Sequence, residues 1–274
     1  MLLPLFLLAS HANGTEQLQR ESNQPETAQL QQSAALIFQN ECASSNACLT
    51  AWNKGEGFAS LGIGHFIWYP AGTKKTFKES FPALLSFMQQ HGATLPGWLS
   101  THPDQANPWH NRTAFLAAYD SKQMQDLRSF LIHSKPLQAR FMLQRLRSTL
   151  PSLLTAVDPA AQQHIRSQFE YVAASPMGLY VLMDYVNFKG EGTSPLERYQ
   201  GKGWGMLQVL EHMSVTQPGL AAIQAFAQAG DAMLSRRVAL SPPERHEQRW
   251  LPGWRKRLAT YMHEAQQLFE HSGR

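Results

Sequence analysis

Two glutamates lie on either side of a cysteine pair near the start of the chain. Glu41 directly precedes Cys42 in ECASSNACL, and Glu56 lies in the glycine-rich stretch GEGFASLGIGHF, residues 55–66. Two carboxyl groups in one site can cleave a glycosidic bond. One gives a proton to the leaving oxygen, and the other activates water or stabilises the oxocarbenium-like transition state. The pair is therefore compatible with acid–base chemistry of this kind.

Glu41 is expected at the end of a short apolar helix. Ala35, Leu36 and Phe38 form its apolar part, and the helix ends near Glu41. A carboxylate at a helix C-terminus faces the negative end of the helix dipole, and Phe38 or Trp52 nearby would desolvate it. Both effects raise the pKa of a carboxyl group. We therefore expect Glu41 to be the general acid, the alternative being a surface glutamate at a helix end.

Glu56 is the expected second catalytic group, with Ser60 holding a water molecule. The alternative for Glu56 is a solvated glutamate in a turn. The glycines of the hairpin are expected to let backbone amides approach a flat sugar ring. His65 is expected to border the substrate and to brace the hairpin by hydrogen bonding rather than to act on the substrate.

This stretch resembles the active-site segment of phage-type lysozymes and, more broadly, of the lysozyme-like superfamily. Glu41 and the run from Ser60 to His65, SLGIGH, are similar to the catalytic Glu and the T-x-G-I-G-H hairpin of those muramidases. The resemblance covers residues 36–66 and implies a helical second lobe that closes a cleft on peptidoglycan. Lys54 stands where the family has Asp or Cys, Ser60 replaces its Thr, and the gap after Glu41 is longer. The usual second carboxylate is therefore missing.

A second unusual segment, DYVNFKGEGTSPLERYQGKGWGMLQVL, spans residues 184–210. Its GWGMLQV is similar to the G-L-M-Q-V segment of goose-type lysozymes and lytic transglycosylases. So many glycines, polar groups and aromatics between two helix patterns predict the opposite wall of a cleft. For Tyr199 and Trp204 the alternative is a place in the core. The expected substrate-binding residues of this wall are Asp184, Asn187, Glu191, Tyr199, Trp204 and Gln208.

The N-terminal segment predicts export. Residues 1–12, MLLPLFLLASHA, have the apolar run and small residues of a signal peptide, although no basic residue precedes them. Residues 13–32 form a polar leader, and residues 33–274 form one domain. In an exported protein Cys42 and Cys48 most simply form a disulfide. Metal binding is the rival, but two thiols without a nearby histidine pair lack the four ligands of a structural zinc site.

Composition and periodicity predict the fold class. The 274 residues are 43% hydrophobic and 10% aromatic, which is typical of a globular protein with a substantial core. Apolar residues recur at helical spacing over 77–88, 141–150 and 220–233, with breaks at 70–73, 92–111 and 190–203. We expect a mostly α (α+β), two-lobed, lysozyme-like domain with a small β-hairpin at the cleft. The basic residues from Arg245 to Arg257 are expected on a solvated helix face.

Together these features predict an exported, periplasmic or secreted glycoside hydrolase. Its substrate is a β-linked amino-sugar polymer, most simply peptidoglycan. We expect a monomer without cofactor, metal ion, nucleic-acid partner or transmembrane segment. Two alternatives remain open. One is a lytic transglycosylase or chitosanase-like enzyme in which Glu41 acts alone, and the other is a non-catalytic module that binds cell-wall glycan.

Overall fold

The computed structural model describes residues 30–100 and 106–272. The predicted signal peptide and residues 13–29 of the predicted leader lie outside this range. A helix covers residues 30–42, so residues 30–32, which were assigned to the leader, are helical. This correction reflects Leu30, which packs against the core and gives the helix an apolar contact one turn earlier than expected.

The chain is mostly helical and carries a small antiparallel sheet, which confirms the predicted fold class. After the first helix, the N-terminal half contains η1 (Asn46–Leu49), β1 (Thr50–Ala51), β2 (Ala59–Leu61), β3 (Phe66–Trp68), α2 (Phe81–Gln90), α3 (Gly97–Ser100), α4 (Arg112–Ala117), α5 (Lys122–His133) and α6 (Lys135–Thr155). The C-terminal half contains α7 (Pro159–Ala173), α8 (Gly178–Lys189), β4 (Arg198–Tyr199), β5 (Lys202–Gly203), α9 (Met206–His212), α10 (Leu220–Leu240), η2 (Pro243–Arg245), η3 (Glu247–Trp250) and α11 (Leu251–Ser272).

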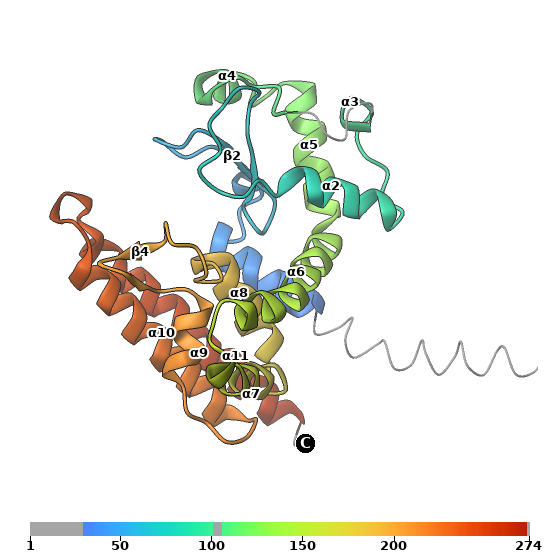
Figure 1. Ribbon diagram of the computed structural model, residues 1–274. Coiled ribbons are helices and arrows are strands. Elements are labelled where there is room, and N and C mark those ends of the chain that lie inside the picture. Colours follow the sequence, from blue (N-terminus) through green and yellow to red (C-terminus); the bar gives the residue numbers. More distant parts are fainter. Residues whose placement is uncertain (1–29, 101–105, 273–274) are drawn as a thin grey trace, which may run out of the picture.

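These elements form two groups, which Figure 1 shows above and below α6. The sheet lies with α2 to α5 in one group, and α7 to α11 make up the other. Helix α6 packs against α2 in the first group and against α7 and α8 in the second. In the second group α10 packs along α11, and Gly230 keeps the two helices close because a Cβ there would lie 3.2 Å from Leu258 Cδ2. One continuous apolar core runs through both groups.

The sheet has the order β1-β2-β3, with Ser60 of β2 opposite Ala51 and Ile67. The turn between β2 and β3 is held from inside the protein: Gln138 Oε1 accepts a hydrogen bond of 2.8 Å from the backbone N–H of Ile63, which is fully buried. These contacts leave little room for side chains in the turn.

The glycines of this turn serve packing rather than the approach of a sugar. Gly62 has φ +70°, a conformation that favours glycine, and a Cβ there would overlap Gln138 Oε1. At Gly64 a Cβ would lie 2.6 Å from Cζ of Phe66. The predicted role of these two glycines, to let backbone amides approach a sugar ring, is therefore corrected.

The predicted chain breaks are largely confirmed. Residues 70–73 are irregular, residues 190–203 contain only the short hairpin strands β4 and β5, and the described part of 92–111 contains only α3. Phe77, predicted to start a helix, lies before α2 with 51% of its surface exposed. In the described residues no helix is both long and apolar enough to cross a membrane.

Candidate functional site

The side chain of Glu41 lies where three distant segments meet. It belongs to the last turn of the first helix, and only 11% of it is exposed. Its Oε1 accepts a hydrogen bond of 2.6 Å from Arg257 Nη2 and one of 3.1 Å from Asn187 Nδ2. Its Oε2 lies 3.3 Å from His65 Nδ1. Every contact comes from a different element, so the site exists only in the folded chain.

Arg257 is the residue that the sequence did not single out. It was expected on a solvated face, but its side chain is only 10% exposed. Besides Glu41 it binds Asp184, with its Nε at 2.8 Å from Oδ2 and its Nη2 at 2.7 Å from Oδ1. Tyr261, one turn further along α11, also donates to Asp184, over 2.6 Å. The i, i+4 spacing of Arg257 and Tyr261 beside the buried Leu258 was the available sequence signal for an inward-facing arginine.

The predicted rise in the pKa of Glu41 is wrong. Burial alone would raise the pKa of this carboxyl group, but the positive charges of Arg257 and His65 and the hydrogen bonds from Arg257 and Asn187 outweigh that effect. The pKa is lowered, and Glu41 is ionised at neutral pH. The prediction failed because it counted the helix dipole and nearby aromatics, whereas the decisive charge comes from a residue far along the sequence.

Glu56 shows the opposite shift. It is half-buried in the turn after β1, where Trp52 Nε1 donates to its backbone oxygen over 2.8 Å and Asn53 Nδ2 lies 3.2 Å from its Oε2. Burial raises the pKa of its carboxyl group, and the hydrogen bond from Asn53 and the charge of His65 oppose this rise without cancelling it. His65 acts electrostatically on both carboxyl groups and lowers both pKa values. The two values differ because Arg257 and Asn187 act on Glu41, whereas burial dominates at Glu56.

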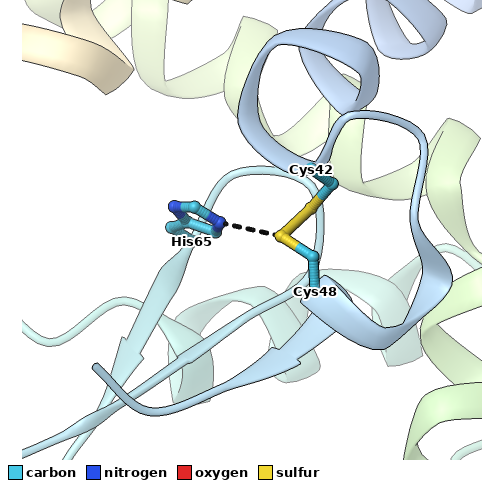
Figure 2. A group of neighbouring side chains, drawn as sticks. All are labelled: Cys42, Cys48 and His65. Atoms are coloured by element: carbon cyan, nitrogen blue, oxygen red, sulfur yellow. Dashed lines mark hydrogen bonds between the residues drawn. A yellow bond between two sulfur atoms is a disulfide. The ribbon is translucent and has the colours of Figure 1, made fainter. Parts of the chain in front are cut away.

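His65 joins the hairpin to the start of the loop after Glu41. A disulfide links Cys42 and Cys48, which confirms the predicted pair, and His65 Nε2 lies 3.4 Å from Cys48 Sγ (Figure 2). Its other ring nitrogen faces Glu41. The backbone of His65 has φ +46°, in the left-handed region where histidine is tolerated better than most residues. The expected bracing role of His65 agrees with these contacts.

The sulfur atoms of the two cysteines and a ring nitrogen of His65 lie within 4.8 Å of one another, which is close enough to surround a metal ion. Metal ions are bound by thiolates, and the disulfide sulfurs of Cys42 and Cys48 carry no negative charge. In the oxidised protein the donor set therefore reduces to one imidazole, which does not fit a structural metal site.

Ser60 is only 4% exposed, on the central strand of the sheet. No hydrogen bond to its hydroxyl group occurs within the described residues. Its expected role of holding a catalytic water stays a prediction.

The residues predicted for the second cleft wall divide into two kinds. Asn187 reaches the site, since it donates to Glu41. Asp184 has no exposed surface and holds Arg257, so its predicted contact with substrate is corrected: it positions the arginine. Gln208 is also buried and is bonded to the backbone of Gly192 and Gly205, which closes the glycine-rich loop. Its predicted contact with substrate is corrected in the same way.

The other three residues of this wall are bound to the protein itself. Glu191 accepts hydrogen bonds from Thr149 and Ser152 of α6. Trp204 is buried, with 7% exposed, so of the two readings the place in the core is the one the structure supports. Tyr199 packs on Trp204 and donates a hydrogen bond of 2.7 Å to Glu247. These contacts give all three residues a structural role.

Lys189 was also missed by the sequence reasoning. It ends α8, and its ammonium group lies 3.9 Å from the ring centre of Phe188 and 3.6 Å from that of Trp254. Burial and the charges of Arg237 and Arg257 together lower the pKa of this amine to about 6, against the opposing charges of Glu247 and Glu41. A lysine directly after YVNF at a helix end was the only sequence signal for it.

No protein-family model, no curated protein and no solved structure matches this chain. The resemblance to the lysozyme-like superfamily therefore rests on the short motifs in residues 36–66 and 203–209, and the function must be argued from the geometry around Glu41, Glu56 and His65.

Proposed function

We propose that this protein is an exported glycoside hydrolase that cleaves a β-linked amino-sugar polymer, peptidoglycan being the expected substrate. One observation carries the proposal: two carboxyl groups that both lie within the electrostatic influence of His65 have pKa values that their surroundings move in opposite directions. Such a pair can supply an acid and an ionised carboxylate at the same pH, which glycosidic cleavage requires.

The pKa shifts exchange the roles predicted for the two glutamates. Glu56, whose pKa is raised, gives its proton to the leaving oxygen as the bond between that oxygen and the anomeric carbon breaks. Glu41 remains ionised and faces the positive charge that develops on the sugar ring. Water then adds at the anomeric carbon and returns a proton to Glu56. His65, Asn187 and Arg257 hold the Glu41 carboxylate in one orientation.

Export is part of this proposal. The Cys42–Cys48 disulfide supports it, because such bonds persist in oxidising compartments such as the periplasm or the extracellular medium.

A second candidate function follows from the same contacts. Because Glu41 already has three partners, the site is also compatible with a non-catalytic module that binds glycan. The two candidates differ in whether the chain releases new sugar ends.

The test is turnover of purified peptidoglycan by the wild type and by the variants Glu41→Gln and Glu56→Gln. Each variant should lose at least about 100-fold in rate, since general acid–base catalysis contributes that much. The exposed Glu170 on α7 provides the matched control, and Glu170→Gln should retain wild-type turnover.

Product masses complete the test. Hydrolysis adds water and leaves reducing ends, whereas a transglycosylase leaves cyclic ends that are lighter by one water molecule. Wild-type protein that binds peptidoglycan but releases no ends would establish the binding module instead. Variants that keep activity within about tenfold would remove the two glutamates from the mechanism.

A further inference from the structure

A pocket opens directly beside the site. It is a small hollow between α6 and α8, with about 20 Å³ of space for the centres of water molecules. Asn187, which donates to Glu41, is part of its wall. The lining is otherwise apolar except for one arginine, and consists of Met142, Arg145, Leu146, Met183, Val186 and Asn187.

The positively charged side chain of Arg145 lines this hollow. This side chain is exposed, yet the surrounding protein desolvates it enough to lower the pKa of its guanidinium group against the opposing charge of Glu191. An exposed arginine on a convex surface would keep its full hydration. Arg145 therefore meets solvent within a hollow, where an anionic ligand would compete with fewer water molecules.

The guanidinium group of Arg145 has no hydrogen bond or ion pair within the described part of the chain. The carboxylate that acts on it electrostatically, Glu191, is occupied elsewhere: its Oε1 accepts from Thr149 over 3.2 Å and its Oε2 accepts from Ser152 over 2.8 Å. The donors of Arg145 are thus available to a ligand. By contrast, the guanidinium group of Arg257 already donates hydrogen bonds to Glu41 and Asp184.

We propose that this pocket is an anion subsite in which Arg145 binds a carboxylate on the peptide substituent of the glycan. A guanidinium group binds a carboxylate through two parallel hydrogen bonds, and the four apolar side chains beside it would contact the carbon atoms next to that carboxylate. The proposal rests on the proposed function and refines it. The subsite favours an anionic, peptide-bearing glycan over a neutral polymer of acetylated amino sugars.

The test compares two ligands that differ only in charge. One is a disaccharide–peptide fragment of peptidoglycan with free carboxylates, and the other is the same fragment with its carboxylates converted to amides. Binding is measured by calorimetry in the full-length Glu56→Gln variant, which should not turn the ligand over. We expect the carboxylate form to bind at least about tenfold more tightly, as for a charge-assisted bidentate pair.

Arg145→Gln in the same background should bring the two affinities within about twofold of each other, since the charge-assisted pair is lost. Arg140→Gln is the matched control, because Arg140 is an exposed arginine on the same helix outside the pocket lining, and it should keep the full preference. Equal affinities in the parent protein, or a preference that survives Arg145→Gln, would overturn the subsite.

The two proposals fail in different ways. Cleavage by the wild type without any preference for the carboxylate form would overturn the subsite and leave the hydrolase. A preference that depends on Arg145, in a protein that cleaves no peptidoglycan, would overturn the hydrolase and leave the subsite.

Discussion

At the level of single residues, the charges around a carboxyl group decide its protonation more than its place on a helix does. A glutamate at a helix C-terminus is disfavoured as an anion by the dipole, an effect of about 0.3–1 kcal/mol at exposed positions. A guanidinium group at 2.6 Å, in a site that excludes most water, outweighs it. Among the residues that the structure describes, no such cation directly contacts Glu56, so burial dominates there.

These shifts predict a bell-shaped dependence of kcat/KM on pH. Glu41 works as an anion and its pKa lies below the ordinary 4.5. Activity should therefore increase as the pH rises through that lowered pKa. Glu56 works protonated and its pKa lies above 4.5, so activity should fall as the pH rises through that higher value. Asn53→Ala removes the hydrogen bond that lowers the pKa of Glu56, and should move only the alkaline limb, to higher pH.

Kinetics on peptidoglycan fragments across a pH series would measure both limbs. A shift of the acid limb in Asn53→Ala, or an unmoved alkaline limb, would contradict the assignment of that limb to Glu56.

Among the elements, the short disulfide loop decides how the first helix leads into the hairpin. After Cys42 the chain turns through Ala43 and Ser44, whose φ angles of +46° and +58° are unusual for residues other than glycine. It then enters η1, where Cys48 returns to Cys42. The disulfide holds this turn closed and keeps the Cys48 sulfur against His65, and thereby ties the hairpin to Glu41.

Replacing both cysteines by serine should lower the free energy of unfolding by about 2 kcal/mol, as loop closure over so few residues predicts. Denaturant unfolding would measure this loss. Amide hydrogen exchange should accelerate between residues 43 and 49, because the open turn no longer has a covalent restraint. Wild-type protein under reducing conditions is the natural comparison and should match the double variant. Unchanged stability and exchange would show that the disulfide does not support the turn.

In the molecule as a whole, Arg257 connects the first helix of the described residues to α8 and α11. It lies on α11, 216 residues from Glu41, and binds Glu41 of the first helix and Asp184 of α8 at the same time. Its guanidinium group also lies over the ring of Phe188, 4.2 Å from the ring centre. The site therefore depends on the packing of the first helix, α8 and α11 into one unit.

Arg257→Met should destabilise the protein by about 3–5 kcal/mol, since two buried carboxylates lose their common cation. Adding Asp184→Asn should recover part of that loss, because one of the unpaired charges is then removed. The surface arginine Arg255, which pairs with Asp231, is the matched control, and Arg255→Met should change stability little. Equal effects of the two methionine substitutions on thermal unfolding would show that the buried network stabilises the protein no more than an exposed ion pair does.

The sequence by itself determined what depends on neighbours along the chain. Helical spacing of apolar residues placed the first helix, α2, α6 and α10, glycine and proline runs located the breaks, and the separation of Cys42 and Cys48 indicated their bond. The neighbourhood of Glu41 and His65 was also recognisable, because a helix end, a short loop and a hairpin follow one another.

Only the tertiary structure decided the electrostatics of the site. The pKa of Glu41 depends on Arg257, and the burial of Asp184 and Gln208 depends on how α8, α9 and α11 pack. Periodicity shows that one side of a helix is apolar, but not which charged residue at its margin turns inward. Coulomb interactions and desolvation act through space, so their sign at a given carboxyl group is set by the residues that folding brings to it.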